Sequence, residues 1–193
     1  MIHSPKSLSD RVAYSLTKFF RFFADTFFAK RYGHRAVVLE TIAGVPGMVG
    51  GMCRYVGSVN KMKDDPVIME LLEEAENERM HLMTFIRIAR PSLLERAIIL
   101  LAQAGFWIFY FLLYVFFRKT AHRMVGYFEE EAVRSYTEYL QEIENGNHEN
   151  VPAPRVAIDY WDLDEDARLS DVVKAVRDDE AGHSITNHKL ASE

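Results

Sequence analysis

The chain has 193 residues, a length that suits one domain, and 49% of them are hydrophobic, which is ample for a buried core. Its formal net charge of −5 argues against a general nucleic-acid binder. The single cysteine, Cys53, cannot form an internal disulfide, which fits a reducing compartment.

The N-terminal segment is basic and aromatic. Residues 1–35 contain seven Lys or Arg side chains against two acidic ones. We predict an amphipathic, membrane-associating helix within residues 1–30, because Phe pairs and cationic side chains are interspersed there. The alternative is an ordinary core helix with a solvated basic face. Residues 1–10 do not resemble a signal peptide, so we expect a protein that works where it is made or on the cytoplasmic face of a membrane.

The rest of the sequence also predicts helices, with no alternating strand pattern. Pro46 predicts a kink in the second helix, and the glycines around it permit the close approach of another helix. Asp65 and Pro66 form a typical helix start, with Asp65 as the N-cap. Residues 146–165 are predicted to form a polar, proline-containing connection. In chain order, the six predicted helices lie roughly at residues 8–29, from 31 onward, 66–90, 93–118, 120–146 and from 170 onward.

One pattern, Glu-x-x-His, occurs twice, and on a helix its spacing places the carboxylate and the imidazole on the same face. Two other predicted helices each offer a lone glutamate. Together these are the ligands of a di-iron or di-manganese four-helix bundle. We therefore predict an all-α, ferritin-like di-iron bundle with two additional membrane-facing helices, in a single domain over residues 1–193. The six candidate ligands are Glu40, Glu78, His81, Glu129, Glu180 and His183.

The charges of this ligand set match a pair of divalent metals. Four carboxylates contribute −4 and two neutral imidazoles contribute nothing, which balances two divalent ions. Hard oxygen ligands with a few nitrogens suit iron or manganese rather than zinc or copper. Such a pair can bind and reduce O₂ when electrons are supplied.

Residues 97–117 form 21 consecutive uncharged positions, a length that by itself predicts a transmembrane helix. A spanning helix would, however, place Glu78 and Glu129 on opposite sides of about 30 Å of hydrocarbon. We therefore favour a monotopic arrangement, in which one side of this helix packs on the bundle and the other faces lipid or a partner subunit.

Several residues near the ligands are candidates for supporting roles. Tyr136 follows Glu129 by two helical turns and is in position to act as a one-electron donor, although a core aromatic is the simpler alternative. Asn77, Asp179 and His122 are candidate outer partners that would orient the ligands through hydrogen bonds. Each of the three could instead be a surface cap or a solvated polar residue.

The motifs resemble those of a known family. Four segments are similar, in order, to the signature segments of the alternative oxidases, and the similarity extends from about residue 31 to residue 188. They are Leu39-Glu40-Thr41, Asn77-Glu78-Arg79-Met80-His81-Leu82, Glu129-Glu130-Glu131-Ala132 and Asp179-Glu180-Ala181-x-His183.

This resemblance implies a cyanide-insensitive quinol oxidase: a non-haem di-iron, interfacial membrane protein, usually a homodimer. Such an enzyme oxidises ubiquinol and reduces O₂ to water without pumping protons. The resemblance implies that the six candidate ligands bind two iron ions and that Tyr136 is redox-active. It implies that four residues just outside the ligands orient them: Asn77, His122, Trp161 and Asp179. It implies a quinol pocket formed by Arg35, Leu39, Glu131, Ala132 and Ser135.

The sequence departs from the family pattern at three positions, and none of them is a candidate ligand. Ser135 stands where Thr is more usual, Asp178 replaces a small residue and Gly182 replaces a larger one. An N-terminal regulatory cysteine and the insertion of plastid quinol oxidases are not found. We therefore expect ubiquinol as substrate and a bacterial, inner-membrane, cytoplasm-facing protein.

Three other functions are considered. A di-iron quinone-ring hydroxylase would use the same ligands but would need an external reductant. A ferritin-like iron-binding protein would need a polar exterior, which the run at residues 97–117 opposes. An integral transporter would require that run to span the membrane.

Overall fold

The computed structural model describes residues 3–28 and 31–193, without the side chains of 27 and 28. Over these residues the chain forms seven helices and no strand longer than an isolated bridge between Pro152 and Arg168. The all-α prediction is therefore confirmed. The chain divides into two compact units, which we call the terminal unit (residues 1–32 and 122–193) and the central unit (residues 33–121). The prediction of a single domain over residues 1–193 stays a prediction.

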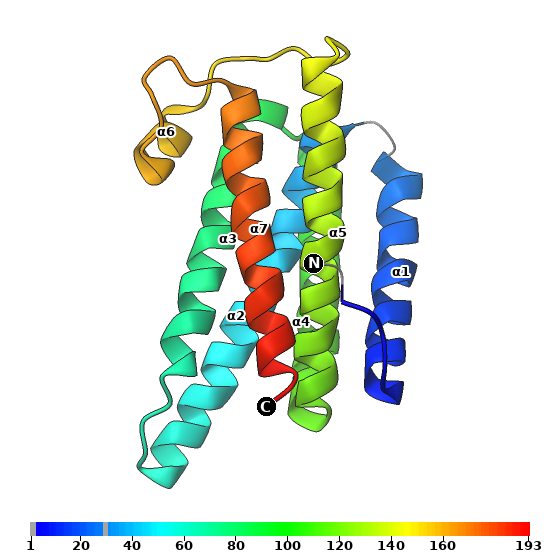
Figure 1. Cartoon of the computed structure of the whole chain (residues 1–193), viewed down its shortest axis with the longest axis vertical. Coiled ribbons are helices and arrows are strands. Elements are labelled where there is room, and N and C mark those ends of the chain that lie inside the picture. The colour runs from blue at the N-terminus through cyan, green and yellow to red at the C-terminus, as the bar shows by residue number, and fades with distance from the viewer. Residues whose placement is uncertain (1–2, 29–30) are drawn as a thin grey trace. The chain divides into compact units, whose positions relative to one another are not determined.

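The central unit contains helices α2 (Tyr32–Lys61), α3 (Val67–Ala89) and α4 (Leu93–Phe116) (Figure 1). Helix α2 continues through Pro46 and approaches α3 closely through small residues. A Cβ atom on Gly47 would lie only 2.4 Å from the carbonyl oxygen of Leu71, and one on Gly51 would lie 2.9 Å from Leu72 Cδ2. The expected close approach at these glycines is therefore present.

Helix α3 begins one residue later than predicted. The N-cap is Pro66 rather than Asp65, and Asp65 Oδ1 instead accepts a hydrogen bond from the main-chain N–H of Val67 at 3.2 Å. Asp65 also pairs with Arg54 of α2 at 2.9 Å, so the side chain serves both the helix start and the α2–α3 connection. Arg90 ends the helix in a left-handed conformation.

Helix α4 is shorter than the predicted 93–118. Ser92 and Glu95 form a capping box at its start, and it ends at Phe116 because Phe117 leaves helical geometry. Its buried residues, Ile99, Phe106, Tyr110 and Tyr114, recur at helical spacing and form one stripe. The next helix begins at once, at Arg118, so one residue separates two helices where the sequence contains neither glycine nor proline.

Both α2 and α4 are long and apolar enough to cross a membrane, judged by length and composition alone, which is weak evidence because core helices pass the same test. The most apolar part of α2 is 61% buried, whereas that of α4 is only 22% buried. Large apolar side chains such as Leu101, Ile108 and Phe116 are exposed on α4. Helix α4 therefore presents the apolar surface that the sequence predicts.

The terminal unit contains α1 (Leu8–Phe28), α5 (Arg118–Glu144) from residue 122 onward, α6 (Arg155–Trp161) and α7 (Leu169–Leu190), with α5 between α1 and α7 (Figure 1). On the α1 side, Thr17 Oγ1 donates to the carbonyl oxygen of Met124 at 3.4 Å. On the α7 side, Ser184 Oγ donates to the carbonyl oxygen of Gly126 at 3.0 Å. Helix α5 is thus held along both sides.

Helix α6 is absent from the sequence prediction. Residues 155–161 form a short helix inside the segment predicted to be an irregular connection. Pro154 precedes it and Asp162 ends it in a left-handed conformation, while Ala157 and Ile158 are buried. Two buried apolar side chains are too weak a sequence signal to predict a seven-residue helix, because tertiary contacts stabilise so short a segment.

The α2–α3 contact gives a test of packing. Gly47→Ala places a methyl group against α3 backbone, so we expect a loss of about 1–3 kcal/mol in unfolding free energy. Gly57→Ala, in the same helix, is the matched control, because a Cβ there meets nothing within 4 Å. Far-UV circular dichroism during denaturant unfolding measures both. Equal stability of the two variants would contradict the proposed tight contact.

Candidate metal centre

Three of the predicted ligands come together within the central unit. Glu40 lies on α2, and Glu78 and His81 lie one turn apart on α3. The Nδ1 atom of His81 lies 3.1 Å from Glu40 Oε2 and 3.4 Å from Glu78 Oε2. The three residues are at most 3% exposed, and their potential ligand atoms lie within 4.8 Å of one another. We call them the central half-site.

Small residues in α2 allow this half-site to form. Gly44 is one turn beyond Glu40, and a Cβ atom on it would lie 3.6 Å from the Cβ of Glu78. The glycines thus bring α2 and α3 close enough for carboxylates from both helices to meet one imidazole. The i, i+3 spacing of Glu78 and His81 places both side chains on the α3 face that α2 covers.

Three more predicted ligands come together within the terminal unit. Glu129 lies on α5, and Glu180 and His183 lie one turn apart on α7. The Nδ1 atom of His183 lies 3.6 Å from Glu180 Oε2, and the potential ligand atoms of the three residues lie within 4.8 Å of one another. Both glutamates are buried, and His183 is half-buried. We call them the terminal half-site.

Three of the four predicted outer partners, Trp161, Asp179 and His122, make hydrogen bonds next to the terminal half-site. The indole Nε1 of Trp161 donates to Asp179 Oδ2 at 2.8 Å, which links α6 to α7 beside Glu180. His122 Nδ1 lies 3.1 Å from Oδ1 of Asn187. Asn77, the fourth predicted partner, is half-buried and precedes Glu78 on α3.

Asn187 was missed by sequence reasoning. Its amide donates to the carbonyl oxygen of His183 at 3.1 Å, while its own oxygen faces His122. It is 1% exposed, so it links α5, from inside the protein, to the turn of α7 that carries the candidate ligand His183. The available signal was its position, one turn after His183 on the same helix face.

Tyr136 is 3% exposed and follows Glu129 by two turns of α5. Tyr139, one turn further, stacks on the ring of Tyr32 with centroids 5.0 Å apart. Burial raises the pKa of Tyr139 to about 12, so this phenol stays protonated at neutral pH. The two tyrosines therefore share a helix and a high degree of burial but differ in distance from the ligands along α5.

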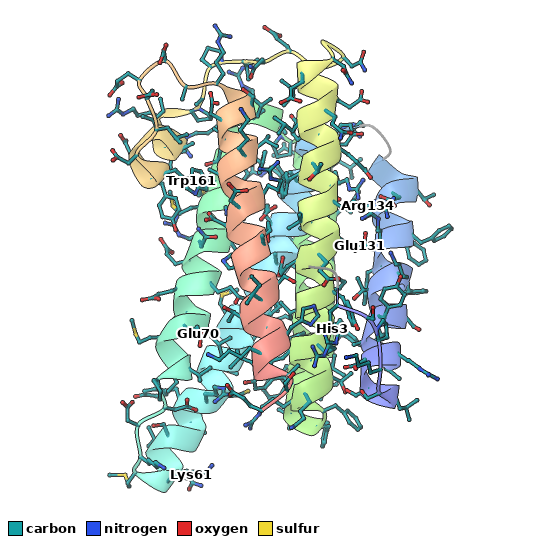
Figure 2. The ribbon with its side chains drawn as sticks, in the orientation of Figure 1. His3, Lys61, Glu70, Glu131, Arg134 and Trp161 are labelled. Carbon is teal, nitrogen blue, oxygen red and sulfur yellow. The ribbon has the colours of Figure 1, made fainter. Side chains whose placement is uncertain are left out.

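The residues of the predicted quinol pocket divide between the units. Arg35 is buried and Leu39 half-buried on α2, in the central unit. Ser135 Oγ donates to the carbonyl oxygen of Glu131 at 2.8 Å on α5, with Ala132 half-buried between them. The Glu131 side chain lies on the α5 surface that faces α1 (Figure 2).

Sequence reasoning missed the partners of Glu131. Lys18 and Arg21 of α1 both form ion pairs with its carboxylate. Arg21 also pairs with Asp25 one turn along α1 at 3.1 Å. Part of the basic face of α1 therefore contacts α5 inside the terminal unit, so this face is not left wholly to solvent or lipid.

The donor set fits iron. Each half-site offers two carboxylates and one imidazole, and so carries −2 when its histidine is neutral, which matches one divalent cation. Buried carboxylates are stable when paired or when bound to a metal. Oxygen-rich ligands with one nitrogen per metal suit iron or manganese. These buried groups fit a di-iron helical bundle.

Comparison with known proteins identifies the family. Residues 1–192 match the family model described as "Alternative oxidase". The chain is 57% identical to "Ubiquinol oxidase, mitochondrial" of Batrachochytrium dendrobatidis, over 97% of this chain and 60% of that protein. It is 54% identical to "Ubiquinol oxidase 1c, mitochondrial" of Arabidopsis thaliana, over 96% of this chain and 57% of that protein. It thus spans about 60% of the length of these relatives. The chain belongs to the alternative oxidase family.

Proposed function

We propose that this protein is a cyanide-insensitive ubiquinol oxidase, which oxidises two ubiquinol molecules to ubiquinone and reduces one O₂ to two waters. The observation that carries the proposal is the pair of half-sites, each with two carboxylates and one imidazole. The names of the relatives supply the substrate, because both are called ubiquinol oxidase. These names do not favour a quinone-ring hydroxylase or a ferritin-like iron-binding protein.

We further propose that the two half-sites serve one di-iron centre, with the six residues as its ligands. The equal charge of the half-sites and the family membership support this assignment. When bound, the two iron ions would supply a site that accepts electrons from the quinol and delivers them to O₂. The protein contributes the burial that keeps bulk water away and the outer hydrogen bonds that orient the ligands.

Tyr136 is the proposed one-electron donor in this reaction. Its burial and its position two turns from Glu129 support the role. Oxidation of a phenol at neutral pH releases its proton together with the electron, so the side chain would need both returned during turnover. The quinol, which carries two electrons and two protons, supplies them.

The quinol head group is proposed to bind at Arg35, Leu39, Glu131, Ala132 and Ser135. Lys18 and Arg21 form direct ion pairs with Glu131, and the hydroxyl of Ser135 is fixed on the same turn. A carboxylate held by two cations remains an acceptor, so Glu131 is suited to receive a hydrogen bond from a quinol hydroxyl.

The donor is dissolved in lipid, so we propose that the protein lies on the membrane surface without crossing it, as a homodimer, and that its reaction moves no protons across the membrane. The exposed apolar residues of α4 and of α1 support a membrane-facing surface. Both relatives are named as mitochondrial proteins, and these names do not support our prediction of a bacterial inner membrane.

The decisive assay is oxygen consumption with ubiquinol as the sole donor. The proposal predicts consumption that resists cyanide, with two quinols oxidised per O₂ and no oxygen added to the quinone. A ring hydroxylase would instead need a separate reductant and would leave oxygen on its product. Consumption that stops with cyanide would exclude the proposed function.

Removal of a ligand tests the metal assignment. We expect Glu129→Ala and His183→Ala to lose at least about tenfold in iron affinity and to lose oxidase activity, because each leaves its half-site with two ligands. Metal analysis of the purified variants measures the iron. Glu138→Ala, on a different turn of α5, is the control and should retain iron. Full iron content in Glu129→Ala would remove this residue from the ligand set.

Replacement of Tyr136 tests the redox role. Tyr136→Phe should retain iron but lose quinol oxidation, because phenylalanine keeps the ring and removes the hydroxyl that is oxidised. Tyr139→Phe, a buried tyrosine one turn away, is the matched control and should retain turnover. Both are measured by oxygen uptake and iron content. Normal turnover in Tyr136→Phe would show that this tyrosine is not required.

A further inference from the structure

A network of charged and imidazole side chains lies within the terminal unit, separate from the ligands. It joins the N-terminal segment, α1, α5 and the end of α7, and His3 lies beside α5 in this arrangement (Figure 2). We call these residues the clasp. Its members are His3, Asp10, Arg123, Glu130 and His188.

The position of one proton in the clasp follows from the neighbours of His188. Its Nδ1 lies 2.9 Å from Nη1 of Arg123, and its Nε2 lies 3.2 Å from Oε1 of Glu130. A guanidinium can only donate, so Nδ1 must accept, and a carboxylate accepts from Nε2–H. His188 is therefore neutral in this arrangement, with its proton on Nε2.

The N-terminal segment closes over this contact. The imidazole of His3 stacks on that of His188 with centroids 4.5 Å apart, and the main-chain N–H of His3 donates to Glu130 at 2.6 Å. Asp10 pairs with Nε of Arg123 at 2.8 Å. Residues 3–10 are thus attached to α5 at both ends.

The charge states of the segment agree with this arrangement. Burial lowers the pKa of His3, and the positive charge of the nearby Arg123 lowers it further, which favours the neutral ring. Burial by itself would raise the pKa of Asp10, but hydrogen bonds from the main-chain N–H groups of Ser7 and Lys6, together with Arg123, lower it overall.

The clasp lies at a close contact between α5 and α7. A Cβ atom on Gly126 would lie 2.6 Å from the ring of His188, so the ring occupies the space that a side chain would need. Sliding of α7 along α5 would separate His188 from both Arg123 and Glu130. Glu130 follows the proposed ligand Glu129 directly, so its attachment also fixes the rotation of α5 at that ligand.

We propose that His188 is a positioning residue: as a neutral bridge between Arg123 and Glu130, it fixes the register of α7 on α5 and thereby the geometry of the terminal half-site. The N-terminal segment holds the bridge closed. The metal-binding part of this inference rests on the proposed function, whereas the register of the two helices does not.

Within the part of the chain that the structure describes, titratable or charged groups contact His188 from two elements. They are His3 from the N-terminal segment and Arg123, Tyr127 and Glu130 from α5. Loss of the imidazole should therefore loosen residues 3–10 and the end of α7 before the rest of the unit.

Glutamine provides a matched replacement. Its amide offers one acceptor and one donor group, as the neutral imidazole does. His188→Gln should therefore keep the clasp, whereas His188→Leu should break it. His188→Asn is a milder break, which serves if the leucine variant does not fold. Ile185→Ala, at an exposed position on α7, is the control.

Anaerobic titration with Fe(II) is the first measurement. His188→Leu should bind iron about tenfold or more weakly, as expected when a partner that orients ligands is removed, and His188→Gln should restore the affinity. Wild-type affinity in a less stable leucine variant would overturn the positioning role and leave only a structural one.

Hydrogen exchange on the metal-free protein is the second measurement. The leucine variant should lose protection in residues 3–10 and the C-terminal turns of α7, and the glutamine variant should keep it. Unchanged protection would overturn the proposed register. Failure of wild type to bind Fe(II) would instead refute the proposed function, and exchange would still decide the register.

Discussion

The burial of carboxylates is the constraint on which the rest of this structure depends. A charged group removed from water is stable only when opposite charge, hydrogen-bond donors or a metal compensates it. In the central unit Glu40 and Glu78 approach the same nitrogen of His81 with almost no exposure to solvent. This arrangement requires α2 and α3 to lie very close, and the glycines of α2 provide that closeness. Packing in this unit therefore follows from the chemistry of its buried groups.

The terminal unit meets the same constraint with polar contacts rather than small residues alone. Asn187 joins His122 to the main chain of His183, and Trp161 holds Asp179 beside Glu180. The clasp adds a further bridge between α5 and α7 beside Gly126, where the ring of His188 occupies the space that a side chain would need. Hydrogen bonds in a dry interior are directional, so they define one register of two helices more sharply than apolar contacts do. Helices that carry the proposed metal ligands need one defined register, because the ligands of one metal must stay at fixed positions.

The apolar surface has a related explanation. Helix α4 buries one stripe and exposes leucine, isoleucine and phenylalanine on the rest of its surface. An exposed apolar surface of this kind marks contact with lipid or with another protein. The proposed substrate, a quinol, is an apolar molecule with a polar head, so the proposed oxidase site would benefit from a membrane-facing scaffold. The ion pairs of Glu131 with Lys18 and Arg21 show that α1 also contributes polar contacts on its inner face.

The sequence by itself determined the helical class and which residues are candidate ligands, because the i, i+3 spacing of Glu78 with His81 and of Glu180 with His183 is local information. It also predicted most helix bounds to within a few residues. It did not reveal α6, the break at Phe117, or the roles of Asn187, His188 and the partners of Glu131. Lys18 and Glu131 are 113 residues apart, and His3 and Glu130 are 127 apart. Only the tertiary structure decides such pairs, because their contact energy exists only once distant helices have packed together.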